Sequence, residues 1–146
     1  MIARSEWTSQ DPNPSGFIAY SESGHSLRFD TTPEHREGPT PMECVLMSLC
    51  ACTQVDVVSI LLKKRQPIAS VTVAAVAEQQ PEPPRYFNKI RLTYTARGTD
   101  GAALSRKAVE DAVALSKDKY CSVSAMLEKA AHIDFIIDFN GVEPLA

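Results

Sequence analysis

The sequence predicts one α+β domain spanning residues 1–146. Three observations predict this class. A long apolar helical segment with a sharp start signal lies in the first half, strand-like segments flank it, and two shorter helical patterns precede a final strand. A chain of 146 residues has the size of one ordinary domain, and its apolar content of 44% is enough to build a core.

The N-terminal part is expected to contain short strands. Segments 16–20 and 26–30 carry apolar and aromatic residues and are separated by residues 22–25, whose serine and glycine suit a hairpin turn. The following polar stretch, 31–40, contains two prolines and a glycine. We therefore predict a loop between this hairpin and the long helix.

The long helix has a recognisable start and end. Thr40 and Glu43 form a capping box with proline at the first helical position, and the helix should run through Leu62 until Pro67 stops further helix. It is apolar on nearly every side, so it needs cover all round. A single small chain supplies too little cover, which predicts a homodimer. Polar residues within the helix, such as Gln54, favour a buried helix over a membrane span.

The second half alternates between strands and helices. Strands are predicted at 70–77, 87–96 and 132–139. A helix capped by Asp100 or Thr99 should cover 101–117, and another should begin near Cys121. The three aromatic residues Tyr86, Phe87 and Tyr94 are expected in the core or in a pocket wall, and their strand spacing favours the core.

Charge and composition exclude some classes of partner. The net charge is −3 without a basic block, which argues against nucleic acid as a partner. Residues 1–14 lack the apolar run of a secretory signal, so we expect a cytoplasmic protein with no membrane attachment. In that reducing compartment, cysteines favour redox chemistry over structural disulfides.

The four cysteines differ in position. Cys44, Cys50 and Cys52 lie on the long helix, whereas Cys121 lies at a later helix start. Residues two apart on a helix point roughly 160° apart, so Cys50 and Cys52 cannot converge on a metal ion. The three histidines show no ligand spacing either. We therefore predict no metal and no cofactor, with Cys44 and Cys50 as buried fillers.

Cys52 and Cys121 have the features of reactive thiols. Cys52 shares a helical stripe with small and polar residues, including Asp56, Ser48 and Ser59. This stripe fits a lined pocket or, equally, a helix-crossing face. Cys121 at a helix N-terminus, with Lys117 and Lys119 nearby, predicts a stabilised thiolate of low pKa, whereas a buried cysteine at the same position would be inert. Two such thiols suit the condensation of a sulfenic acid to a disulfide.

Two segments resemble a known family. Residues 38–43, followed by Cys52 and the run 56–61, are similar to the central-helix signature of the OsmC/organic hydroperoxide resistance family. Residues 119–127 resemble that family's second-cysteine motif. The resemblance extends over about residues 24–139, and it is nearer to the YhfA-type branch than to the established hydroperoxide reductases.

The resemblance implies an OsmC-like intertwined homodimer, in which two β-sheets surround long central helices and each active site lies at the subunit interface. It implies that Cys52 attacks an organic hydroperoxide, that Cys121 resolves the sulfenic acid, and that a dithiol reduces the disulfide. Two positions depart from the family. Met42 replaces the glutamate after the helix-start proline, and the family's hairpin arginine has no clear equivalent. Glu43, His25 and Arg28 are the candidate supporting residues.

Three functions follow as hypotheses. The first is a cysteine-based peroxidase for organic hydroperoxides, acting in oxidative stress defence. The second is a non-enzymatic protein that binds a small apolar or electrophilic ligand at the dimer interface. The third is a redox sensor or structural dimer. A peroxidase requires Cys52 and Cys121 to come within disulfide range, with Cα atoms under about 7 Å apart, and a binding module does not.

Overall fold

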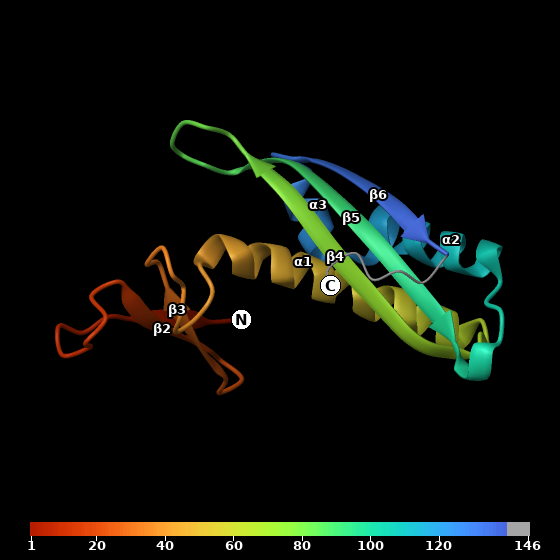
Figure 1. Cartoon of the computed structure of the whole chain (residues 1–146), viewed down its shortest axis with the longest axis horizontal. Helices are drawn as coiled ribbons and strands as arrows, with labels where there is room; N and C mark the ends of the chain where they lie inside the picture. The colour runs from red at the N-terminus through yellow and green to blue at the C-terminus, as the bar shows by residue number, and fades with distance from the viewer. Residues whose placement is uncertain (140–146) are drawn as a thin grey trace. The chain divides into compact units, whose positions relative to one another are not determined.

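The computed structural model of the protein describes residues 1–139. The chain forms two compact units, which we call the N-terminal unit, Met1–Leu46, and the C-terminal unit, Met47–Ala146. The long helix α1, Pro41–Lys63, begins in the first unit and continues in the second (Figure 1). Strands both precede and follow helices along the chain, so the predicted α+β class is confirmed.

The N-terminal unit contains a three-stranded antiparallel sheet in the order β1-β2-β3. Its strands are β1 (Ala3–Glu6), β2 (Gly16–Ser21) and β3 (Ser26–Asp30). The predicted hairpin joins β2 to β3, and the rings of Phe17 and Phe29 stack at paired positions with centroids 5.2 Å apart. The sequence therefore predicted the hairpin at the right residues.

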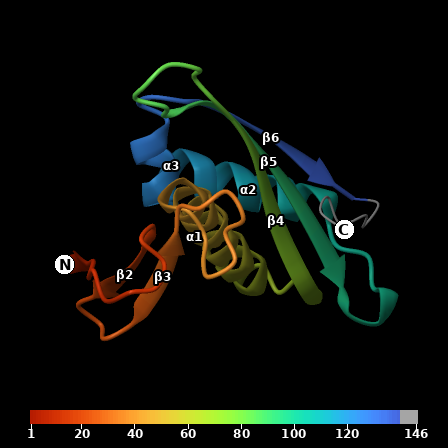
Figure 2. The same ribbon diagram turned by 60° about the vertical axis from the view of Figure 1, so that its left-hand side comes forward.

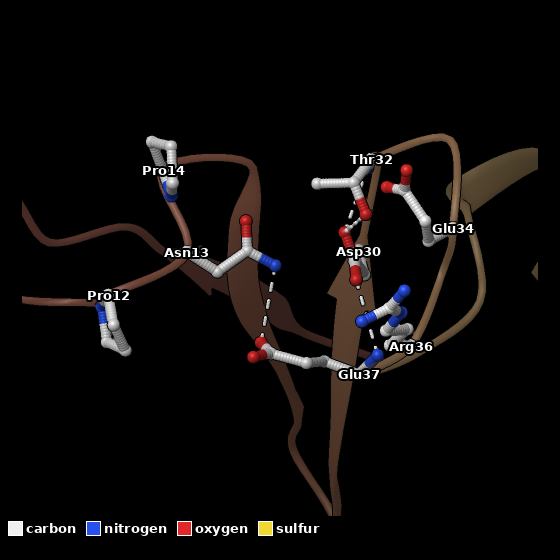
Figure 3. Close-up of a pocket in the computed structure, with 8 residues that line it drawn as sticks. All are labelled: Pro12, Asn13, Pro14, Asp30, Thr32, Glu34, Arg36 and Glu37. Atoms are coloured by element: carbon white, nitrogen blue, oxygen red, sulfur yellow. Dashed lines mark hydrogen bonds between the residues drawn. The ribbon is translucent and has the colours of Figure 1, made fainter.

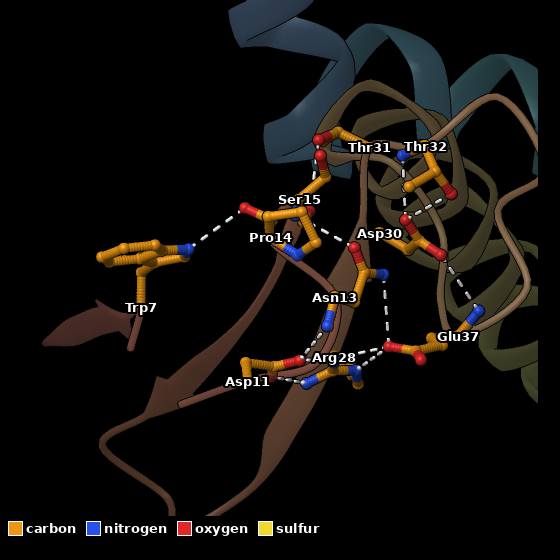
Figure 4. A network of polar contacts seen from close by, with 10 residues as sticks. All are labelled: Trp7, Asp11, Asn13, Pro14, Ser15, Arg28, Asp30, Thr31, Thr32 and Glu37. Carbon is orange, nitrogen blue, oxygen red and sulfur yellow. Dashed lines mark hydrogen bonds and ion pairs between the residues drawn. The ribbon is translucent and has the colours of Figure 1, made fainter. Parts of the chain in front are cut away.

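The loop after β3 is organised by the buried carboxylate of Asp30. This group accepts hydrogen bonds from the Thr32 backbone N–H at 2.8 Å, the Thr32 hydroxyl at 2.7 Å and the Glu37 N–H at 3.2 Å (Figure 4). The bonds from Thr32 hold the pKa of Asp30 well below its usual range. A pocket of about 430 Å³ lies beside this loop (Figure 3), and it is lined by Pro12, Asn13, Pro14, Asp30, Thr32, Glu34, Arg36 and Glu37.

Helix α1 starts and ends as predicted. The Thr40 N–H donates to Glu43 Oε2 at 2.7 Å and the Glu43 N–H donates to Thr40 Oγ1 at 3.2 Å, which completes the capping box. At the other end, Arg65 takes a left-handed φ of 54°. This lets its N–H and that of Gln66 reach the carbonyls of Leu62 and Leu61, closing the helix before Pro67.

The C-terminal unit contains a second three-stranded sheet in the order β4-β5-β6. Its strands are β4 (Ile68–Gln79), β5 (Phe87–Gly98) and β6 (His132–Asp138). Strand β4 pairs antiparallel with β5, whereas β5 and β6 are parallel. A parallel pair needs a crossover connection, and the chain uses residues 99–131 for it.

The first helix of this crossover differs from the prediction of a helix over 101–117. Thr99–Gly101 forms a short 3₁₀ turn in which Asp100 has a φ of 50°, so neither Thr99 nor Asp100 caps a helix. Helix α2, Arg106–Leu115, begins later because the Ser105 hydroxyl accepts from the Ala108 N–H at 3.3 Å. The Thr99 N–H is instead tied to the Pro67 carbonyl at 2.7 Å.

After α2 the chain makes a π-helical turn, Ser116–Tyr120, and then a short helix α3, Ser122–Leu127. Cys121 is the N-cap of α3, as predicted from its place at a helix start. The π turn was not predicted. Its hydrogen bond spans five residues, from the Cys121 N–H to the Ser116 carbonyl at 2.8 Å.

The core of the C-terminal unit lies between its sheet and its helices. Figures 1 and 2 show α1, α2 and α3 on the same face of the sheet. Phe87 and Tyr94 are buried, as predicted, but Tyr86 is 44% exposed, so its core assignment was wrong. Tyr86 precedes β5 and therefore escapes the strand's inward face. The fully buried apolar side chains include Leu49, Val57, Leu61, Ile90, Ala112 and Val113.

Helix α1 buries one stripe of residues, at spacing four: Leu49, Thr53, Val57 and Leu61. Other apolar side chains of the helix are open, with Val55 60% exposed and Leu62 58% exposed. By length and composition the helix could cross a membrane, and 22% of its most apolar 18-residue window is buried inside the chain. One chain therefore covers only one side of an apolar helix.

Candidate thiol site

The structure brings Cys52 and Cys121 together from distant parts of the chain. Cys52 lies midway along α1 and is half-buried, whereas Cys121 caps α3 and is 2% exposed. Both are free thiols, and Cys52 lies near enough to Cys121 to raise the pKa of the Cys121 thiol. Neighbouring thiols can form a disulfide where their Cα atoms come within about 7 Å of each other.

The backbone fixes the position of Cys121 tightly. Its N–H donates to the Ser116 carbonyl at 2.8 Å, and its sulfur accepts from the Ser124 N–H at 3.4 Å. The sulfur therefore takes the capping role that a serine or aspartate oxygen usually has. As a result, the thiol is held inward, toward α1, instead of rotating into solvent.

The predicted low pKa of Cys121 is not what the structure gives. Burial raises the pKa of Cys121, and its contact with Cys52 acts in the same direction, against the lowering effect of Ser124. The lysines point elsewhere, with Lys117 Nζ 5.5 Å from the Phe135 ring centroid and Lys119 Nζ 5.4 Å from that of Tyr120. Reduced Cys121 is therefore a neutral thiol at neutral pH.

A buried cluster of hydroxyl groups lies beside the two cysteines and was not predicted. We call Thr53, Tyr94 and Ser116 the hydroxyl cluster. Thr53 Oγ1 is 2.7 Å from Tyr94 Oη and 2.8 Å from Ser116 Oγ, and Ser116 Oγ donates to Asp56 Oδ2 at 3.0 Å. All three hydroxyl-bearing residues are at most 2% exposed. Each hydroxyl thus has a partner, as buried polar groups require.

The surroundings of Tyr94 connect this cluster to the thiols. Burial raises the pKa of Tyr94 to about 12, the hydrogen bond from Thr53 opposes this, and the nearby charges that Cys121, Cys50 and Asp56 would carry raise it further. Tyr94 is therefore a neutral hydroxyl in a low-dielectric site. The sequence signal for this hydroxyl cluster was weak, because it consisted of one polar residue, Thr53, within the buried stripe of α1.

Part of the helical stripe that carries Cys52 lines a pocket. Asp56 and Ser59 line a pocket of about 470 Å³ together with Lys63, Lys64 and Tyr120, among others. Ser48 is exposed. Of the two interpretations of this stripe, the pocket is the one that the structure supports at Asp56 and Ser59. Since Asp56 also accepts from Ser116, it links the hydroxyl cluster to the pocket wall.

The supporting residues proposed from the sequence lie in the N-terminal unit, and each has partners there. The Arg28 guanidinium forms a two-bond ion pair with Asp11, at 2.7 and 2.9 Å, and also binds Glu37 (Figure 4). These carboxylates raise its pKa. His25 Nδ1 is 3.1 Å from the Ser23 hydroxyl in the hairpin turn. Glu43 is the capping partner of Thr40, and this contact lowers its pKa.

The other two cysteines are half-buried. Burial raises the pKa of Cys44 and that of Cys50. They fit the predicted role of small packing residues, although neither is fully enclosed. Across residues 1–139, the structure has no group of three or more histidine, cysteine, aspartate or glutamate side chains that could hold a metal ion.

Comparison with known proteins places this arrangement in a family. The model of the family described as OsmC-like protein matches residues 33–135, which is well over half of the chain. The chain belongs to the OsmC-like family. Within it, Protein YhfA of Escherichia coli K12 is 44% identical over 117 residues, covering 80% of this chain and 84% of YhfA. The resemblance predicted from the two cysteine motifs is confirmed.

Solved structures agree with the OsmC-like fold. A hypothetical protein from Aquifex aeolicus VF5 is 29% identical with a TM-score of 0.75, over 94% of this chain and 95% of that one. An organic hydroperoxide resistance protein OsmC from Legionella pneumophila has a TM-score of 0.68 at 14% identity, over 94% and 96% of the two chains. The second likeness shows a shared fold.

Proposed function

We propose that this OsmC-like protein is a thiol-dependent peroxidase that reduces organic hydroperoxides, with Cys52 as the peroxidatic and Cys121 as the resolving cysteine. The observation that carries the proposal is the proximity of two free thiols, a half-buried one midway along α1 and a buried one at the N-cap of α3. A half-buried thiol paired with a buried one is the arrangement that traps a sulfenic acid as a disulfide.

The chemistry balances in three steps. The Cys52 thiolate attacks the outer peroxide oxygen of ROOH, the O–O bond breaks, and the leaving alkoxide takes up a proton to become ROH, giving Cys52–SOH. The Cys121 sulfur then attacks the Cys52 sulfur, and the hydroxyl leaves with the Cys121 proton as water. A dithiol finally reduces the disulfide and is itself oxidised to a disulfide.

The difference in exposure between the two thiols supports this assignment of roles. Cys52 is the more open of the two thiols, and it lies one helical turn before Asp56 on the pocket wall. Cys121 is enclosed, and its raised pKa keeps it as a neutral thiol until the sulfenic acid forms. The apolar side chains that surround Cys52 on α1 favour an organic hydroperoxide over hydrogen peroxide.

We also propose that the protein acts as a cytoplasmic homodimer. The exposed apolar side chains of α1 support this, because Met47, Val55 and Leu62 are each more than half exposed in one chain. A second copy of the helix would cover them. Light scattering should give twice the mass of the chain, and a monomer at working concentration would contradict the proposal.

Turnover with cumene hydroperoxide and a dithiol tests the enzymatic proposal. Cys52→Ser should abolish turnover, because the attacking sulfur is lost. Cys121→Ser should permit one oxidation per site and then stop. Cys50→Ser is the matched control on the same helix and should retain activity. Equal turnover by Cys52→Ser and the parent would refute the mechanism.

One observation supports the non-enzymatic alternative. Arg28, the arginine nearest to the expected position in the hairpin, is held by two carboxylates, Asp11 and Glu37. An arginine so engaged does not supply a free cation to a thiolate. If Cys52 reacts with the hydroperoxide no faster than glutathione does, binding of a small apolar or electrophilic ligand becomes the better proposal.

A further inference from the structure

Ser116 is bonded to both segments that carry the paired cysteines. Its carbonyl accepts from the Cys121 N–H at 2.8 Å, which ties it to the start of α3. Its hydroxyl binds Thr53 Oγ1 at 2.8 Å and Asp56 Oδ2 at 3.0 Å, which ties it to α1. Thr53 is the residue after Cys52, and Asp56 lies one helical turn beyond Cys52. The serine therefore bridges the two thiol-bearing segments.

The bridge is rigid because it is buried and fully bonded. Ser116 has no exposed surface and Thr53 is 1% exposed. The Thr53 hydroxyl is also fixed by Tyr94 Oη at 2.7 Å, so its orientation is set from β5. Hydrogen bonds in a low-dielectric interior hold their geometry more strongly than those at the surface. Movement of Ser116 away from α1 would leave several buried polar groups without partners, which is costly.

The local backbone points to the same role. Ser116 begins the π-helical turn that ends just before Cys121. π turns are rare and recur at functional sites, because the extra residue redirects the side chains that follow. Here the turn places Cys121 in the interior, where it is 2% exposed and lies near Cys52.

We propose that Ser116 is a positioning residue that sets the separation of the Cys52 and Cys121 thiols, with Thr53 and Tyr94 holding the Ser116 hydroxyl in place. This inference rests on the proposed function in taking Cys52 and Cys121 as the redox pair. A disulfide requires a narrow range of Cβ separations and of dihedral angles about the S–S bond. Loosening the bridge lowers the effective concentration of one thiol for the other.

A thiol–disulfide equilibrium with glutathione tests this without any hydroperoxide. The protein dithiol and one glutathione disulfide give the Cys52–Cys121 disulfide and two reduced glutathione molecules, so atoms and electrons balance. The equilibrium constant, measured by alkylation and mass spectrometry, reports the effective concentration of the two thiols. Cys44→Ser with Cys50→Ser serves as the parent background, which removes other pairings.

In this background we expect Ser116→Ala and Thr53→Val to lower the effective concentration by about tenfold, the size expected from losing one buried hydrogen bond. Thr53→Ser keeps the hydroxyl and should restore the parent value. Ser122→Ala, at the exposed first residue of α3, is the matched control and should leave it unchanged. If Ser116→Ala does not fold, the Thr53→Val and Thr53→Ser pair gives the same comparison.

The possible results separate this inference from the proposed function. A merely structural role would destabilise the reduced and oxidised proteins equally, and an unchanged equilibrium constant in Thr53→Val would overturn the positioning role. A parent protein that forms no Cys52–Cys121 disulfide in glutathione would overturn it as well. A parent that forms the disulfide but does not reduce hydroperoxide would refute the peroxidase alone, and the fall in Thr53→Val would still support positioning.

Discussion

Each of the two units is stabilised internally by a different kind of contact. In the C-terminal unit, apolar side chains from α1, α2, β5 and β6 are fully enclosed. In the N-terminal unit, Gly16 and Asp30 are the buried residues, and neither offers an apolar side chain. Contacts of Asp30 with its loop, and of Arg28 with Asp11 and Glu37, hold that unit instead.

Most of the stability and the candidate thiol site therefore belong to the same part of the chain. Enclosed apolar side chains contribute strongly to global stability because truncating one leaves a cavity, whereas contacts between partly exposed charged groups contribute less and act locally. The candidate thiol site lies in the unit with the core. Its cysteines and hydroxyl groups are therefore placed by packing, whereas the N-terminal unit has exposed apolar residues such as Ile2 and Trp7, on either side of β1.

The largest effect should come from the apolar core. Ile90→Ala in β5 removes a side chain with no exposed surface and should lower the free energy of unfolding by about 2–5 kcal/mol. The matched change in the N-terminal unit, Asp30→Asn, should cost less overall but should speed hydrogen exchange of the Glu37 amide that the carboxylate binds. Urea unfolding and hydrogen-exchange mass spectrometry measure the two effects. Equal global losses would contradict the contrast between the units.

A smaller effect should appear at alkaline pH. The pKa of Tyr94 is raised from 10 to about 12 in the folded protein, so the stabilisation due to its neutral hydroxyl is complete below pH 10 and is lost as pH rises from 10 toward 12. This amounts to about 2–3 kcal/mol. Over that range the free energy of unfolding of Tyr94→Phe should fall less than that of the parent, by this amount. Parallel curves for the two proteins would show that Tyr94 is not enclosed in solution.

Much of the fold could be predicted because its signals are local. The capping box of Thr40 and Glu43, the hairpin of β2 and β3, and the strand pattern of β4 to β6 each reside in neighbouring residues. The helix after β5 was misplaced because Thr99 and Asp100 have the right side chains for a cap. Their backbone instead forms a 3₁₀ turn, and the Thr99 N–H donates to the Pro67 carbonyl. The local sequence pattern reveals neither contact.

The candidate site was only partly accessible to sequence reasoning. The cysteine pair was predicted from two motifs that resemble those of a family. The bond between Thr53 and Ser116 joins residues 63 positions apart, and isolated hydroxyl residues carry no periodic signal. The proton affinity of Cys121 was misjudged for a related reason. A helix start and two lysines favour a thiolate, but burial and the direction of those lysines depend on tertiary packing.

The most direct test of the account adds one equivalent of cumene hydroperoxide to the reduced protein, quenches by alkylation within seconds, and maps disulfides by peptide mass spectrometry. The proposed mechanism requires a bridge between Cys52 and Cys121, formed faster than glutathione is oxidised, with Cys44 and Cys50 still alkylated. A bridge through Cys44 or Cys50, or oxidation of Cys52 no faster than that of glutathione, would contradict it.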